Sequence, residues 1–169
     1  MKNFFLISTL LTTLFLQTPA ASTVPFRFRH ITVEDGLASN TVRSIWQNDR
    51  GIMWFGTSQG LCSFDGINIK LYPIVTDEEP SGSNKYVYAM MQDKNGLLWV
   101  GTDEGVYKYD YEKNEFKFFN RETENGERIE NIVNNMAEDK DGNIWFSSFE
   151  QGVYRYSPGS GRLKRFPME

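Results

Sequence analysis

The sequence predicts an all-β protein built from three copies of one four-stranded unit. Similar segments begin at Val42, Val87 and Val133. Each has a central tryptophan, and these tryptophans lie 45 residues (54 to 99) and 46 residues (99 to 145) apart. Aromatic and β-branched runs alternate with turn glycines, without the apolar period of 3.6 that indicates helices. A repeat of about 40–50 residues with four short strands is typical of a β-propeller blade.

The N-terminus has the features of a targeting segment. Lys2 precedes an apolar stretch from Phe4 to Leu16, and small residues follow at Thr18 and Ala20. This order is typical of a signal peptide cleaved after position 20, and the stretch is short for a membrane span. An uncleaved membrane anchor is the alternative. We expect an exported protein whose fold begins after residue 20.

Residues 21–41 form the predicted lead-in to the first blade. Within them, Phe26–Thr32 has the character of an outermost blade strand without the rest of its blade. In a closed propeller such a strand pairs with the last blade and seals the ring. The sequence therefore predicts a partial β-propeller, with three four-stranded antiparallel blades plus an N-terminal closing strand.

Each predicted blade contains two glycine turns. The first turn opens with Asp or Asn, whose side chain caps the amides of the turn. It closes with glycine, which can take a positive φ. The predicted blades are residues 42–72, 87–119 and 133–166, and the connections are 73–86 and 120–132. The structural glycines are Gly51, Gly96 and Gly142 in the first turns and Gly60, Gly105 and Gly152 in the second.

The second strand of each unit is apolar on both faces, as in Met53-Trp54-Phe55. Such a strand must be covered on both sides, which is the situation of an inner strand between two neighbouring blades. We interpret Trp54, Trp99 and Trp145 as wedges between blades. One buried indole of ~200 Å² contributes about 5 kcal/mol at ~25 cal/mol per Å². A platform that stacks on sugars is the alternative role for these rings.

The third strand of each unit begins after the second glycine. The fourth strand is the short, charged strand at the outer edge of the unit. A short, charged fourth strand is what an exposed sheet edge needs. The predicted strands are Val42–Gln47, Ile52–Thr57, Leu61–Asp65 and Ile67–Tyr72; Leu97–Thr102, Val106–Asp110 and Phe116–Phe119; and Asn143–Ser148, Val153–Ser157 and Leu163–Phe166.

The order of an Asp-rich turn, Gly, Trp, Gly-Thr, Gly and Tyr-x-Tyr-Asp resembles the two-component regulator propeller repeat. The segment HITVEDGLASNTVRSIWQNDRGIMWFGTSQGLCSFDG is similar to the same family. The resemblance covers Phe26 to Phe166. It implies the periplasmic sensor region of a hybrid two-component histidine kinase that responds to glycan fragments. Relatives carry more blades and a kinase domain, so the resemblance implies an N-terminal fragment without the kinase. The third repeat departs from the pattern at Ser147-Ser148 and at Gln151.

Composition and charge exclude several function classes. The net charge is −4, from 18 Lys and Arg against 22 Asp and Glu, which argues against duplex DNA or an anionic membrane as partner. His30 is the only histidine and Cys62 the only cysteine, so a Ser-His or Cys-His pair is not expected beyond chance. We expect no catalytic residue, no metal site and no cofactor. His30 is interpreted as a structural residue of the closing strand.

A ligand is expected on the propeller face formed by the connections between blades and by the turns between second and third strands. The starts of the inner strands open onto this face, where an arginine and a tyrosine can hydrogen-bond to and stack on a sugar. The candidate ligand-binding residues are Arg43, Tyr88, Asn134, Gln59, Glu104 and Glu150. For each of them, an ordinary solvated loop or channel residue is the alternative.

The leading functional hypothesis is a non-catalytic sensory module for an oligosaccharide. One alternative is a fragment of a propeller-type lyase or hydrolase, although the single histidine argues against it. The other alternative is a protein-interaction propeller. Three blades leave two apolar faces without a neighbour, so we also expect either further blades or self-association.

Overall fold

The computed structural model describes residues 27–74 and 85–168. The chain divides into two units, Met1–His30 and Ile31–Glu169, and the second unit holds every described strand. The predicted signal peptide, residues 1–20, lies outside the described residues, as does most of the connection 73–86. Within the described ranges, no helix has the length and apolar character needed to cross a bilayer.

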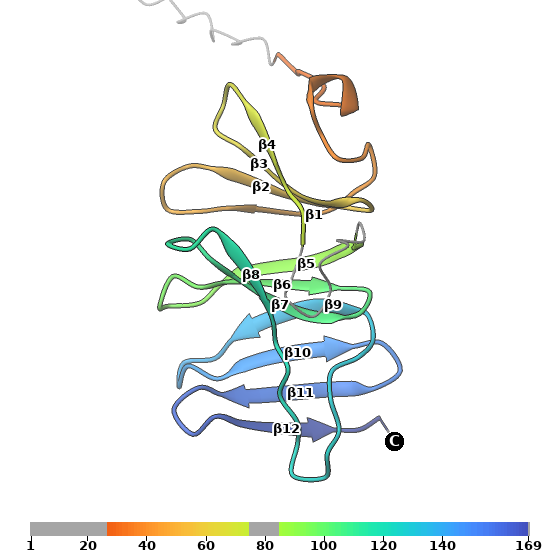
Figure 1. Cartoon of the computed structure of the whole chain (residues 1–169), viewed down its shortest axis with the longest axis vertical. Helices are drawn as coiled ribbons and strands as arrows, with labels where there is room; N and C mark the ends of the chain where they lie inside the picture. Colours follow the sequence, from red (N-terminus) through yellow and green to blue (C-terminus); the bar gives the residue numbers. More distant parts are fainter. Residues whose placement is uncertain (1–26, 75–84, 169) are drawn as a thin grey trace, which may run out of the picture. The chain divides into compact units, whose positions relative to one another are not determined.

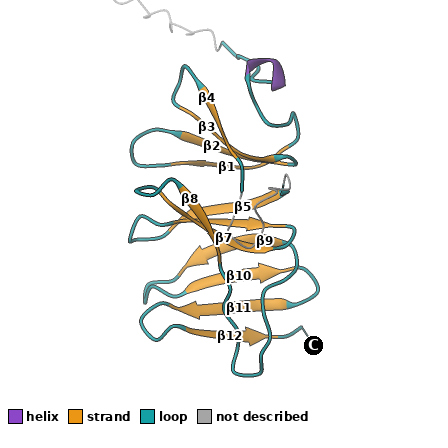
Figure 2. Cartoon of the chain, in the orientation of Figure 1, coloured by secondary structure: helices purple, strands orange, loops and turns teal. Residues whose placement is uncertain are grey.

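The described strands form three four-stranded antiparallel sheets, which confirms the predicted all-β architecture (Figures 1 and 2). Each sheet follows the chain order from inner to outer strand, and we call the sheets blades 1, 2 and 3. Blade 1 contains β1 (Val42–Gln47), β2 (Met53–Thr57), β3 (Gly60–Phe64) and β4 (Ile69–Tyr72); blade 2 contains β5 (Val87–Gln92), β6 (Leu98–Thr102), β7 (Gly105–Asp110) and β8 (Glu115–Phe118); blade 3 contains β9 (Val133–Glu138), β10 (Ile144–Ser148), β11 (Gly152–Ser157) and β12 (Arg162–Phe166). The predicted strands agree with these bounds to within two residues at either end.

The first turn of blades 2 and 3 ties the hairpin to the central tryptophan. In blade 2, Asp93 Oδ1 accepts hydrogen bonds from the backbone N–H groups of Asn95 (2.9 Å) and Leu97 (3.0 Å). Its other carboxylate oxygen accepts from Trp99 Nε1 at 2.9 Å. Asp139 does the same for Trp145 in blade 3, at 2.8 Å. One carboxylate therefore caps the turn and fixes the indole.

Blade 1 lacks this link because its turn residue is an amide. Asn48 Oδ1 accepts from the backbone N–H groups of Arg50 and Ile52, as the aspartates do. The other end of the Asn48 side chain is an NH₂ group, which donates and cannot accept from an indole. Trp54 Nε1 is accordingly buried without a hydrogen-bond partner.

We expect Asn48→Asp to raise the free energy of unfolding by about 1–3 kcal/mol, because it gives a buried donor its acceptor. Urea unfolding at pH 7 measures the change, and Asp93→Asn is the matched reverse variant, expected to lower the free energy of unfolding by a similar amount.

The hydrogen bonds from Trp145 and Asn143 lower the pKa of Asp139. A carboxylate introduced at position 48, with a pKa lowered in the same way, would contribute stability above its unfolded pKa of about 3.9. That stability is lost as pH falls through the folded value. Unchanged stability in both variants would contradict this role of the turn carboxylate.

The central tryptophans of blades 1 and 2 lie between blades, which confirms two of the three predicted wedges. Trp99 is 1% exposed, and its ring centroid lies 5.6 Å from that of Phe146 and 6.0 Å from that of Tyr156, both in blade 3. Trp54 is 2% exposed and lies 5.9 Å from Tyr109 of blade 2. Apolar side chains from facing sheets thus form one core between each pair of blades.

Trp145 differs from the prediction because a neighbouring blade covers only one face of its sheet. It is half-buried, and its ring stacks on Phe166 of its own blade at 5.6 Å and 27°. No described ring of another blade contacts it. A wedge needs a sheet on each side, and among the described residues Trp145 has none on its outer side.

The predicted closing strand Phe26–Thr32 is not observed in its described part. Residues 27–32 form no strand, and the short 3-10 helix η1 (Val33–Asp35) follows them. Thr32 caps this helix: its side chain accepts from the Glu34 N–H, while the Asp35 carboxylate accepts from the Thr32 N–H. A strand needs a hydrogen-bonding neighbour, and no described strand pairs with this segment. His30 therefore lies in exposed irregular structure, not in a strand.

Candidate functional site

Three of the predicted ligand residues occupy the same unusual position in their blades. In each blade the pairing of the first and second strands shifts register by one residue, and the residue passed over is Arg43, Tyr88 or Asn134. This is a β-bulge, which leaves its extra residue unpaired and re-aims the side chain. The first strands β1, β5 and β9 are neighbours in space. The fold therefore presents three bulge side chains from adjacent inner strands.

Arg43 and Tyr88 contact each other across blades 1 and 2. The guanidinium carbon of Arg43 lies 5.0 Å from the centroid of the Tyr88 ring and 6.0 Å from that of Tyr86. The two tyrosine rings are stacked, with centroids 6.3 Å apart and planes 26° apart. The separation of the guanidinium from the Tyr88 ring is within the range of a cation–π interaction. We call Arg43, Tyr86 and Tyr88 the bulge cluster.

Tyr86 was not singled out from the sequence, where it marked only the end of a connection. It is 41% exposed, so its ring is available to a ligand. Its signal in the sequence is its spacing, since residues two apart in an extended chain point to the same side. The pair Tyr86 and Tyr88 therefore indicated one aromatic surface.

The segment before β5 is held in place by the turn between β6 and β7. Asp103 Oδ1 accepts from the Tyr86 N–H at 3.1 Å, and the Asp103 N–H donates to the Tyr86 carbonyl at 3.2 Å. Burial raises the pKa of Asp103. The predicted ligand residue Glu104 accepts a hydrogen bond from the Lys85 ammonium, which is 2% exposed. Glu104 is thus engaged in an ion pair with the residue that precedes Tyr86.

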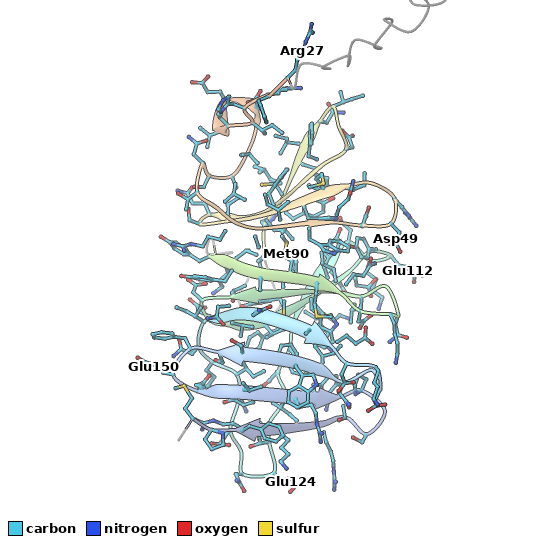
Figure 3. All side chains as sticks on the ribbon, turned by 180° about the vertical axis from the view of Figure 1, so that it is seen from behind. Arg27, Asp49, Met90, Glu112, Glu124 and Glu150 are labelled. Carbon is cyan, nitrogen blue, oxygen red and sulfur yellow. The ribbon has the colours of Figure 1, made fainter. Side chains whose placement is uncertain are left out.

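The other candidates lie at the same end of the blades without joining the bulge cluster. Asn134 is exposed, and its Oδ1 accepts from the Ser147 hydroxyl. Gln59 is exposed in the turn between β2 and β3. Glu150, in the matching turn of blade 3, has a left-handed φ of 59°. In Figure 3 Glu150 lies at one end of the blades and Asp49 and Glu112 lie at the other. In the described structure, no hydrogen bond or ion pair links these three candidates to Arg43 or Tyr88.

Two hollows lie away from all six candidates. One, of about 570 Å³, is at the opposite end of blades 1 and 2, and its lining includes Arg50, Tyr109 and Tyr111. Burial raises the pKa of Tyr111 to about 12, so its phenol stays neutral. The other, of about 630 Å³, lies beside β12, where Thr123 of the connection between β8 and β9 bridges Leu163. Figure 1 shows this connection running past β12.

The described side chains offer binding chemistry at the bulge cluster. Within residues 27–74 and 85–168, no group of three or more His, Cys, Asp or Glu side chains is placed to hold a metal ion. Cys62 is buried, and desolvation raises the pKa of its thiol, which disfavours the reactive thiolate. The bulge cluster supplies guanidinium N–H donors beside the exposed ring of Tyr86 and the half-buried ring of Tyr88, an arrangement suited to hydrogen bonding and stacking.

Residues 81–104 and 127–150 match the model of the two component regulator propeller family. These segments are two-component regulator propeller repeats. They cover the inner strands of blades 2 and 3 and so include two of the three bulges. The repeat type predicted from the residue pattern is confirmed for these two segments. No protein among curated sequences matches the chain.

Solved structures with the same fold include extracellular domains of bacterial sensor systems. The extracellular domain assigned to the hybrid two-component system BT3049 of B. thetaiotaomicron has 23% sequence identity and a TM-score of 0.72, over 85% of this chain and 20% of that one. The extracellular domain of BT4673 from the same organism has 22% identity and a TM-score of 0.66, over 79% and 17%. A chain of the mitotic checkpoint complex has 14% identity and a TM-score of 0.52, over 84% and 41%. The present chain thus spans about a fifth of the length of the bacterial domains, and the likeness establishes a propeller fold.

Proposed function

We propose that this chain is a ligand-binding segment of an exported sensor of the two-component type, and that its ligand is an oligosaccharide bound at the bulge cluster. The observation that carries the proposal is the Arg43 guanidinium over the Tyr88 ring, with both residues at β-bulges. Binding there requires no catalytic group, so the proposed role is sensing, in the periplasm, without turnover.

The chemistry of the cluster fits a sugar. The C–H face of a pyranose packs on an aromatic ring, and its hydroxyl groups accept hydrogen bonds from a guanidinium. Arg43 is exposed, and the Tyr86 ring is 41% exposed beside it. The Tyr86 backbone is pinned by Asp103, so the ring is partly pre-organised and binding has less conformational entropy to overcome.

The sensor context is supported by the repeat family and by the fold. Two segments are two-component regulator propeller repeats, and the similar structures from B. thetaiotaomicron are described as extracellular domains of hybrid two-component systems. The N-terminal segment with the features of a signal peptide agrees with export.

Arg43→Ala and Tyr88→Ala are each expected to weaken oligosaccharide binding by about 10–100-fold, since each removes one to two interactions of about 0.5–3 kcal/mol. Calorimetric titration of the purified protein with a panel of plant and host oligosaccharides measures the affinity. Arg50→Ala and Tyr111→Ala are matched controls, because they remove the same side chains at the opposite end of the blades. Equal affinities of Arg43→Ala, Tyr88→Ala and the unmodified protein would overturn the proposed site. In a full-length sensor that contains this segment, Arg43→Ala and Tyr88→Ala should each weaken the transcriptional response to the oligosaccharide.

A further inference from the structure

The bulge cluster is formed where two blades meet, because blade 1 contributes Arg43 and blade 2 contributes Tyr86 and Tyr88. The tyrosine segment is fixed to blade 2, since Asp103 holds the Tyr86 backbone through two hydrogen bonds of 3.1 and 3.2 Å. Val87 lies between the two tyrosines in the chain, is 0% exposed and packs in the core between blades 1 and 2. The place of Val87 therefore sets the place of both rings.

Gly56 of β2 lies where Val87 meets blade 1. A Cβ built on Gly56 would lie 2.6 Å from Val87 Cγ1 and 3.1 Å from Val87 Cβ, and it would overlap the Ser44 hydroxyl. Ser44 pairs with Gly56 in the strand register and directly follows Arg43 at the bulge. One glycine thus lies against the residue beside Arg43 and against the residue between the two tyrosines.

The equivalent glycine between blades 2 and 3 is equally close to its neighbour but does not border the bulge cluster. By strand register Gly101 takes the position of Gly56, and Val133 lies against it as Val87 lies against Gly56. A Cβ at Gly101 would lie 2.6 Å from the Val133 carbonyl oxygen and 3.0 Å from Val133 Cγ1. The chain neighbours of Val133 are an isoleucine and an asparagine. No aromatic pair depends on the Gly101 contact.

We propose that the packing of blade 2 on blade 1 controls the ligand site, and that Gly56 is the positioning residue through which this packing acts. Carbon atoms in contact lie about 3.5–4.0 Å apart, so a Cβ at position 56 would move Val87 away by about 1 Å. The Arg43 guanidinium carbon lies 5.0 Å from the Tyr88 ring centroid and 6.0 Å from that of Tyr86. A shift of ~1 Å takes the first contact to the ~6 Å limit of a cation–π interaction and the second beyond it.

The displacement falls on the tyrosine segment because Ser44 can yield and Val87 cannot. The Ser44 hydroxyl is buried and makes no hydrogen bond in the described structure, so rotating it away breaks none. Val87 has less freedom, since a β-branched side chain is restricted in χ1 and its surroundings are closely packed. The backbone of Val87 must therefore move, and the tyrosines on either side move with it.

The control of binding rests on the proposed function, whereas the position of Arg43 over the rings can be measured without a ligand. In the unmodified protein, the ring currents of Tyr86 and Tyr88 should shift the side-chain protons of Arg43 upfield in the NMR spectrum. Gly56→Ala should return these protons most of the way to the values of a solvated arginine. Gly101→Ala is the matched control, because it overpacks the neighbouring interface, and it should leave the Arg43 protons unchanged.

Calorimetric titration with the oligosaccharide that the unmodified protein binds most tightly is the second measurement. Gly56→Ala should weaken binding by about tenfold and Gly101→Ala by less than about twofold, since only the first separates Arg43 from the rings. The double variant Gly56→Ala/Val87→Ala lacks the obstructing Cγ1. It should restore the Arg43 shifts, and it should restore the affinity to within about threefold. Circular dichroism checks folding, and Val87→Ile, which overfills the same contact from blade 2, replaces Gly56→Ala if that variant does not fold.

Arg43 shifts that survive Gly56→Ala would overturn the positioning by Gly56. So would a double variant that restores neither the shifts nor the affinity, or a Gly101→Ala variant that weakens binding as much as Gly56→Ala, because the effect would then follow stability alone. Lost Arg43 shifts with full affinity would instead overturn the proposed ligand site and leave the positioning standing. If no oligosaccharide binds, the proposed function fails, and the Arg43 shifts still decide the positioning.

Discussion

Trp99→Ala is expected to lower the free energy of unfolding by about 3–5 kcal/mol, the usual cost of truncating a large buried ring. Trp99 is 1% exposed, packs against rings of two blades and donates its indole N–H to Asp93. The variant therefore leaves a cavity at the centre of the interface between blades 2 and 3, and it removes the indole donor of Asp93 Oδ2 in the turn. Chemical denaturation followed by circular dichroism measures the loss.

Trp145→Ala is the matched control for this prediction. Trp145 has the same turn partner, Asp139, and the same place in its strand, but it is half-buried and has no described ring of another blade against it. We expect less than half the loss found for Trp99→Ala, because less apolar area leaves water on folding. The comparison is made at protein concentrations where single copies prevail. Equal losses in the two variants would show that the cost arises within one blade and not between blades.

Gly101→Ala is expected to destabilise the protein by about 1–3 kcal/mol through overpacking. A Cβ at Gly101 would lie 2.6 Å from the Val133 carbonyl oxygen and 3.0 Å from Val133 Cγ1. The obstructing atom is backbone at the start of β9, so relief requires blade 3 to move away from blade 2. Thermal and urea unfolding both report the change.

Gly159→Ala is the control substitution for Gly101→Ala. A Cβ at Gly159 meets no atom within 4 Å, and its backbone is not in the left-handed region. Its effect is expected to be neutral or slightly stabilising, by less than about 1 kcal/mol, since alanine restricts the unfolded chain. A tolerated Gly101→Ala would contradict the close approach of neighbouring blades.

The blades were predictable from the sequence because each level of the pattern repeats. The Asp or Asn turns, the glycines and the central tryptophans recur at nearly equal spacing, and all three indicate the same strand boundaries. Strands such as Val42–Gln47 were placed without error for this reason. The register position of Trp99 also gave its burial, because an inner strand that is apolar on both faces must be covered on both.

The features that escaped prediction depend on neighbours that the pattern does not specify. The segment 27–32 has the composition of a strand, yet a strand forms only where a partner offers hydrogen bonds, and no described strand does. Arg43 and Tyr88 were selected as starts of inner strands. The β-bulges at which they lie arise from a one-residue shift in pairing that single-strand propensity does not encode.

The missing hydrogen bond of the Trp54 indole N–H follows from the sequence once it is known that the turn carboxylate accepts from the indole. Asn48 and Asp93 both suit a turn, and their turn-capping chemistry is the same. The two side chains differ only in the second carboxylate oxygen of Asp93, which accepts from the tryptophan indole. Asn48 has an NH₂ group in its place. The difference between an amide and a carboxylate has a structural consequence only because the indole lies within reach.

The repeats fold into blades, and the tryptophans of blades 1 and 2 pack against the next blade. Nuclear Overhauser contacts from the assigned indole protons measure this packing most directly. The structure predicts contacts from Trp99 to the rings of Phe146 and Tyr156, and from Trp54 to the ring of Tyr109, each from one repeat to the next. Contacts from both indoles to residues of their own repeats alone would contradict it.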